Sequence, residues 1–198
     1  MPNPNPPYYV SFSADPVRSA TVDHTQSAPG GVATRAGHTS ISFSGKGGLT
    51  WAPVTGMPRT DGMVPFYFLS VNVFFRLTDF AIQISSDYAQ GSCAFNATMR
   101  HEVDEHIVNP TRIMFGFRDQ VIAALNRVRL PTQNAPDWVR PDQVDATEAG
   151  YISQVGAVIR TYRQRVSAAM LQAQAASDAP DRYQTVYRQC PAEEWNQP

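Results

Sequence analysis

The pattern of apolar residues changes once along this chain, near residues 90–92, and the change restricts the folds open to it. Before that point, short segments alternate apolar and polar residues or are rich in aromatic and β-branched residues, as strands are. After it, apolar residues recur every three or four positions, as on one face of an α-helix. Strands followed by helices predict an α+β fold, with an N-terminal antiparallel sheet and a helical half behind it.

One segment of the first half should form the centre of the sheet. Residues 66–76 are the most hydrophobic part of the chain, and we expect a buried strand there. Thr78 and Asp79 predict a tight connection to an antiparallel partner strand at residues 80–85. Further strands are expected at residues 8–12 and 39–43, with a returning strand from residue 49 and a loop rich in Pro and Gly over residues 53–65.

The second half opens with a predicted helix over residues 93–108, and Ser92 is expected to be its N-cap. Asn109 and Pro110 predict its end, because proline disfavours a helical residue before it and suits the first position of the next helix. An amphipathic helix is expected to follow over residues 110–129.

The rest of the chain predicts one long helix and one short one. The long helix should begin at a cap, Asp145 or Thr147, and reach about Ala176. A short helix should then extend to Tyr187, and Asp178 is expected to cap it.

Length and composition indicate one globular domain. We expect a single domain over residues 8–198 of this 198-residue chain, behind a flexible, Pro-rich segment at residues 1–7. Apolar residues make up 42% and charged residues 17%, which favours a globular protein. The net charge is −1 without a basic run, so no nucleic-acid partner is expected. No stretch approaches the roughly 20 apolar residues of a spanning helix, so we expect no membrane span. We also expect a monomer.

The two cysteines, Cys93 and Cys190, predict either one disulfide or two free thiols. One bridge would close a loop of nearly a hundred residues, worth roughly 4–5 kcal/mol in the chain-entropy model. Residues 1–7 lack the basic start and apolar run of a signal peptide, but such an opening could follow removal of a leader. With the two cysteines, it favours an exported protein.

A cluster of histidine and glutamate side chains stands out in the first predicted helix: His101, Glu102, Glu105 and His106. A helix with the spacing H-E-x-x-H presents two zinc ligands and a general base together. Here the spacing is H-E-x-x-x-H, because Glu105 stands where the second His is expected. At about 100° per residue, all four side chains still share one broad face of a helix.

Three arrangements of this cluster are open. His101 and Glu105 could be the ligands on a regular helix, with Glu102 as the base, because zinc also accepts carboxylate oxygens. His101 and His106 could be the ligands if a π-bulge brings residues five apart into line. Alternatively, the cluster binds no metal and its polar residues form a solvated face.

The residues ahead of the cluster resemble a known group of proteins. Residues 91–93 read G-S-C, and such a segment before the His-Glu pair resembles uncharacterised bacterial zincin-like proteins, which are similar to the zincin metallopeptidases. The resemblance covers about residues 66–130. It implies a zincin-like fold, a zinc ligand at His101 and a general base at Glu102. The second His departs from the family spacing by one residue. In zincins an edge strand above the motif helix aligns an extended substrate.

A third protein ligand would have to come from elsewhere in the chain. Glu148 opens the long helix, which suits a gluzincin-like arrangement, although an acidic residue there also favours the helix dipole. Asp119 and Asp178 are weaker candidates.

The leading hypothesis is therefore a zinc-dependent peptidase that hydrolyses peptide or cell-wall peptide bonds. Zn²⁺ would be its cofactor, Glu102 would activate the water, and the strand at residues 80–85 would align the peptide or peptidoglycan-type substrate. The alternative is a non-catalytic binding or effector module that keeps the scaffold with a degenerate metal site.

Overall fold

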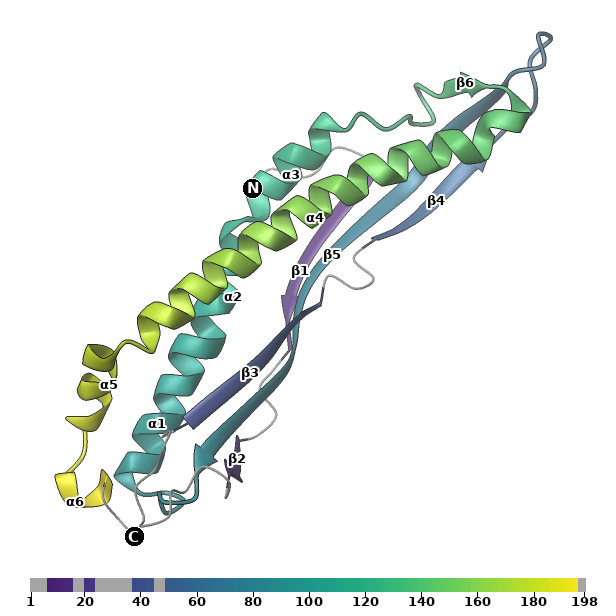
Figure 1. The fold of residues 1–198 in the computed structure, drawn as a ribbon. Coiled ribbons are helices and arrows are strands. Elements are labelled where there is room, and N and C mark those ends of the chain that lie inside the picture. The colour runs from purple at the N-terminus through teal and green to yellow at the C-terminus, as the bar shows by residue number, and fades with distance from the viewer. Residues whose placement is uncertain (1–6, 16–19, 24–36, 45–48, 196–198) are drawn as a thin grey trace. The chain divides into compact units, whose positions relative to one another are not determined.

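Strands precede residue 86 and, apart from one short strand, helices follow residue 92, so the predicted α+β fold is confirmed (Figure 1). The computed structural model describes residues 7–15, 20–23, 37–44 and 49–195. Every strand of the six-stranded sheet pairs with the long strand β5 (Val64–Ser85). Its partners are β1 (Tyr8–Ala14), β2 (Ala20–Asp23), β3 (Gly37–Ser44), β4 (Leu49–Thr55) and β6 (Asp137–Val139).

The chain divides into two compact units. Unit 1 comprises Met1–Ser13, Ser44–Arg76 and Met114–Val166, and unit 2 comprises Ala14–Phe43, Leu77–Ile113 and Ser167–Pro198. Strand β5 and helix α4 (Val144–Ser177) each contribute to both units. The single domain over residues 8–198 stays a prediction. Of the segment expected to be flexible, residues 1–6 lie outside the described residues, whereas Pro7 is buried and its carbonyl accepts the Val71 N–H.

Unit 1 is organised by the first half of β5. Strand β4 pairs with it antiparallel over residues 66–73, and β6 pairs antiparallel with its first three residues. Leu69 has no partner in the β4 register, so it forms a bulge, and the buried positions change there from even to odd numbers. The core of this unit is apolar and includes Phe66, Phe68, Val71, Val73, Phe75, Met114, Val121, Ile122, Leu125 and Val155.

The predicted turn at Thr78 and Asp79 is wrong, because β5 continues through both residues. Asp79 has a left-handed backbone, with φ of 58°, and the buried side chains switch there from Leu77 and its odd-numbered predecessors to Phe80 and its even-numbered successors. Asp79 thus behaves as an extra residue within the strand. Asp is one of the few residue types that adopt a left-handed backbone. Both a bulge and a hairpin turn can contain a left-handed residue, so the sequence does not distinguish between them.

The sheet is mixed rather than wholly antiparallel. Strand β2 runs parallel to the end of β5, with Ala20 beside Ile82 and Asp23 beside Ser85. The segment predicted as a substrate-aligning strand, residues 80–85, pairs with β2 along one of its edges, and its role in aligning a substrate stays a prediction. Parallel pairing with a distant segment has no local sequence signal, unlike a hairpin.

The motif helix is one continuous helical rod of three parts: α1 (Cys93–Val103), the π-helical η1 (Asp104–Val108) and α2 (Asn109–Gly116). Ser92 is confirmed as the N-cap, since its hydroxyl accepts the Phe95 N–H at 3.1 Å. The predicted end at Asn109 and Pro110 is wrong. Pro110 lacks an N–H and would crowd the carbonyl four residues back, and the wider π-turn before it accommodates both effects. The Asn109 N–H bonds five residues back to Asp104.

The remaining helices are close to their predicted places. The segment expected as one helix over residues 110–129 is divided, because α2 ends at Gly116 and α3 spans Arg118–Arg127. Glycine is the poorest helix former after proline. A 3₁₀ turn, η2 (Pro141–Gln143), leads directly into α4, which therefore starts at Val144, before the predicted caps. Helices α5 (Pro180–Tyr187) and α6 (Ala192–Trp195) follow.

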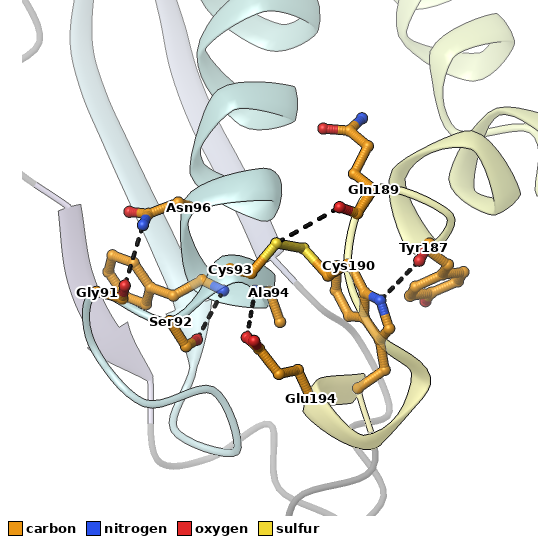
Figure 2. The surroundings of a disulfide bond; sticks show 11 residues. Gly91, Ser92, Cys93, Ala94, Asn96, Tyr187, Gln189, Cys190 and Glu194 are labelled. Atoms are coloured by element: carbon orange, nitrogen blue, oxygen red, sulfur yellow. Dashed lines mark hydrogen bonds between the residues drawn. A yellow bond between two sulfur atoms is a disulfide. The ribbon is translucent and has the colours of Figure 1, made fainter.

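Of the two expectations for the cysteines, the disulfide is confirmed: Cys93 and Cys190 are bridged (Figure 2). The bridge joins the first residue of α1 to the segment after α5. A polar contact supports the same junction, because the Ala94 N–H donates to Glu194 at 3.2 Å. Within the C-terminal segment, the Trp195 indole N–H donates to the Tyr187 carbonyl at 2.7 Å. The C-terminal segment is thus tied to the start of the motif helix.

Among the described helices, none is both long and apolar enough to cross a membrane.

Candidate metal centre

Three side chains of the motif helix form a cluster that could hold a metal ion. One ligand atom from each of His101, Glu102 and His106 can be chosen so that all three lie within 4.8 Å of one another. The Glu102 and His106 side chains are buried, at 1% and 6% exposure, and His101 is half-buried. All three belong to unit 2. This is the only such group that the described part of the chain contains.

The π-turn is what brings the two histidines together. On a regular α-helix, residues five apart point about 140° away from each other. Because η1 has π-helical bonding from Asp104 onward, His106 lies close to His101, with their ring centroids 5.4 Å apart. Of the arrangements open at the sequence level, the structure has the π-bulge that pairs His101 with His106.

Glu105 points to a different partner. The Ser177 hydroxyl, at the last residue of α4, donates to its Oε2 atom at 2.8 Å. The next residue, Asp178, approaches His106, with its Oδ1 atom 3.1 Å from His106 Nε2. The end of α4 therefore contacts two successive residues of the π-turn.

Glu102 is held by a residue from the sheet. The Thr39 hydroxyl, on β3, donates to Glu102 Oε2 at 2.6 Å, and both side chains are buried. Figure 1 shows β3 beside α1, as this bond requires. The bond gives Oε2 a partner and leaves Oε1, the other carboxylate oxygen, without one from Thr39.

Two polar atoms of the cluster are buried without a partner. His101 Nε2 and Glu102 Oε1 have no hydrogen-bond partner among the described residues. Burying such atoms unpaired costs about 1–3 kcal/mol each, so they are expected to have a ligand. An imidazole nitrogen beside a carboxylate suits zinc, which takes nitrogen and oxygen donors. The residues present therefore fit a zinc ion.

The environment of His101 also favours a metal ligand. Burial lowers the pKa of His101 below its usual value, which favours the neutral imidazole that binds metals. The Tyr183 ring, from α5, packs against it at 4.9 Å between centroids. Beside them is a cavity of about 160 Å³, lined in part by Arg100, Glu105 and Arg182. This volume is below the roughly 300 Å³ of a typical small-molecule pocket.

The other candidate ligands are not members of the group formed by His101, Glu102 and His106. Glu148 belongs to unit 1, where its carboxylate accepts the Trp51 indole N–H at 2.6 Å. Asp119 is an exposed residue in the first turn of α3. Asp178 was expected to cap the last helix, which is wrong, because Ala179 is the N-cap of α5 and no described side chain caps it.

Sequence reasoning missed Thr39, Ser177 and Tyr183. Thr39 and Ser177 are ordinary strand and helix residues with no local pattern, and each meets the cluster through a contact more than 60 residues away in sequence. Tyr183 follows Asp178 by five residues, and its position depends on how α5 packs onto α1. None of the three has a motif that would have identified it.

Replacing Thr39 with valine should destabilise the protein by about 1–3 kcal/mol, because Glu102 Oε2 would lose its donor while staying buried. Urea denaturation measures the change. Thr39→Ser keeps the hydroxyl and serves as the matched control. Equal stability of the valine and serine variants would show that the bond does not matter for folding.

Comparison with protein-family models, with curated proteins and with solved structures finds no match. The fold and the cluster therefore define this chain as an α+β protein with a disulfide and a possible His-Glu-His metal centre.

Proposed function

We propose that this chain is a zincin-like, zinc-dependent hydrolase, most concretely a peptidase that acts on peptide or cell-wall peptide bonds. The observation that carries the proposal is the pair of buried, unpartnered atoms, His101 Nε2 and Glu102 Oε1, within one cluster of the described residues. A metal ion gives the nitrogen a partner, and a water gives the oxygen one. A nitrogen donor for the metal and a carboxylate for the water are two of the groups that metal-assisted hydrolysis uses.

Each residue of the cluster has a role in this proposal. His101 and His106 would hold the zinc, and the bound ion would supply a Lewis acid for polarising a carbonyl group. Glu102 accepts a proton from the attacking water and returns it to the leaving amine. Thr39 donates to Glu102 Oε2, which leaves Oε1, the oxygen without a partner, to take the water.

The substrate strand of this proposal is β3 rather than residues 80–85. Among the described strands, β3 has β5 as its partner. It also carries Thr39, which contacts the general base. An extended peptide added to β3 would lie along the motif helix by ordinary strand addition.

The disulfide supports export, because such bridges persist in oxidising compartments. The rival function is a binding module that keeps the scaffold without catalysis. It is favoured by one observation: Tyr183 packs against His101, and the cavity of about 160 Å³ beside them is too small for a peptide. Catalysis therefore requires α5 to shift when substrate binds.

The Glu102→Gln variant tests catalysis directly. It should keep zinc and lose cleavage of a mixed peptide and peptidoglycan-fragment library by about 10²–10⁴-fold, which is the usual contribution of an acid–base group. Asp119→Asn, an exposed change in unit 1, is the control and should cleave as the parent does. A zinc-loaded parent that cleaves nothing in the library would favour the binding module instead.

A further inference from the structure

We propose that Asp178 is the third protein ligand of the metal centre, and that Ser177 and Glu105 position it. The inference rests on the proposed function to the extent that it requires a bound zinc ion. It differs from the sequence-based expectation, which favoured Glu148 over Asp178 for this role.

The distances of Asp178 and Glu102 from His106 support Asp178 as a ligand. Zinc ligands about 2.0–2.1 Å from the ion lie about 3.3 Å apart in a tetrahedron. Asp178 Oδ1 is 3.1 Å from His106 Nε2, close to that separation. Glu102 Oε2, which accepts the Thr39 hydroxyl, is farther from the same nitrogen, at 4.0 Å.

Asp178 lies beside the cluster, and its carboxylate contacts His106 directly. It lies outside the group whose atoms are mutually within 4.8 Å, but its side chain is 46% exposed and can rotate. With the N-cap of α5 at Ala179, Asp178 is not used to cap that helix. A carboxylate with two histidines is a common zinc ligand set.

Glu105 holds Asp178 beside the motif helix, although the two residues are far apart in sequence. Its carboxylate accepts the Ser177 hydroxyl at 2.8 Å, which fastens the end of α4 to the π-turn. The Asp178 N–H continues the helical bonding to Gln174 at 2.9 Å, so Asp178 follows Ser177 in a fixed direction. Glu105, the residue that lengthens the motif, therefore has two roles. As the additional residue of the π-turn it brings His106 toward His101, and its carboxylate binds the end of α4.

The rival ligand, Glu148, has a hydrogen-bond partner of its own. Glu148 accepts the Trp51 indole N–H within unit 1 and is not a member of the described cluster. Glu148 therefore provides a matched control: it is an acidic residue of α4, the helix that Asp178 follows, and the proposal predicts it to be dispensable for zinc.

Zinc affinity measured against a chromophoric chelator tests the proposal, on Asp178→Asn, Glu148→Gln and Ser177→Ala proteins. Removing a ligand should exceed the 10–100-fold loss typical of an outer-shell change, so we expect Asp178→Asn to weaken binding by more than about 100-fold. Ser177→Ala should weaken it by about 10-fold, and Glu148→Gln should leave it unchanged. The visible absorption of bound Co²⁺ should change with Asp178→Asn only.

Two results would overturn the inference while leaving the proposed function intact. In one, Asp178→Asn binds zinc as tightly as the parent. In the other, Glu148→Gln loses zinc, which would restore the sequence-based expectation. A folded parent that binds no zinc would overturn both proposals. Because Asp178 is half exposed, Asp178→Asn should fold normally, and its circular dichroism and unfolding midpoint check this.

Discussion

Replacing both Cys93 and Cys190 with serine should lower the free energy of unfolding by about 4–5 kcal/mol. This is the largest stability loss among our predictions. The bridge spans 97 residues of sequence, so its removal frees a long loop in the unfolded chain. Urea denaturation under non-reducing conditions measures the loss. The single segment most affected should be the one after α5, which the bridge ties to α1.

Reduction of the parent protein provides a matched control for the cysteine variant. A dithiol should convert the bridge to two thiols and produce the same loss of stability, whereas it should not affect the serine variant. If the serine variant is as stable as the oxidised parent, the bridge contributes nothing and the C-terminal segment is held by other contacts. The bonds from Ala94 to Glu194 and from Trp195 to Tyr187 would then be the ones to test.

The histidine spacing leads to the second large effect. His106→Ala should weaken zinc binding by more than about 100-fold, because it removes a proposed ligand. Glu105→Ala should still bind one zinc, with a loss no larger than that of Ser177→Ala, because Glu105 only anchors α4. Isothermal titration with zinc separates the two variants. The reverse order of losses would indicate that Glu105, not His106, is the ligand.

Deleting Glu105 gives a complementary test of the π-turn. The deletion restores the spacing H-E-x-x-H, which brings the second His to the position four residues after His101 on a regular helix. We expect zinc binding to be retained, without the Ser177 anchor. Loss of zinc in a folded deletion variant would mean that the π-turn itself is required to shape the site.

Local signals in the sequence predicted the helical character of the second half and the start of α1, although not the ends of every helix. Ser92 before an apolar-periodic stretch identified the start of α1, and the one-residue excess between His101 and His106 identified a π-bulge as one of its explanations. Both features depend on neighbours within one or two helical turns. Such features can be predicted from a short segment of sequence.

Non-local features were not predictable in the same way. The two halves of β5 each have their own alternation, and only the pairing partners reveal that the strand continues through Asp79. Thr39 reaches Glu102 only because β3 lies beside α1. Asp178 reaches His106 only because α4 ends at the π-turn. In each case a residue acquires its role from packing between distant segments, which residue spacing cannot show.

The most direct test of the metal centre is the zinc content of the purified parent protein, measured by plasma mass spectrometry after incubation with zinc and removal of the excess. The account predicts about one zinc per chain, and none in His101→Ala, whose imidazole is the unpartnered ligand of the described cluster. A folded parent protein with no zinc, or a His101→Ala protein that holds as much as the parent, would contradict it.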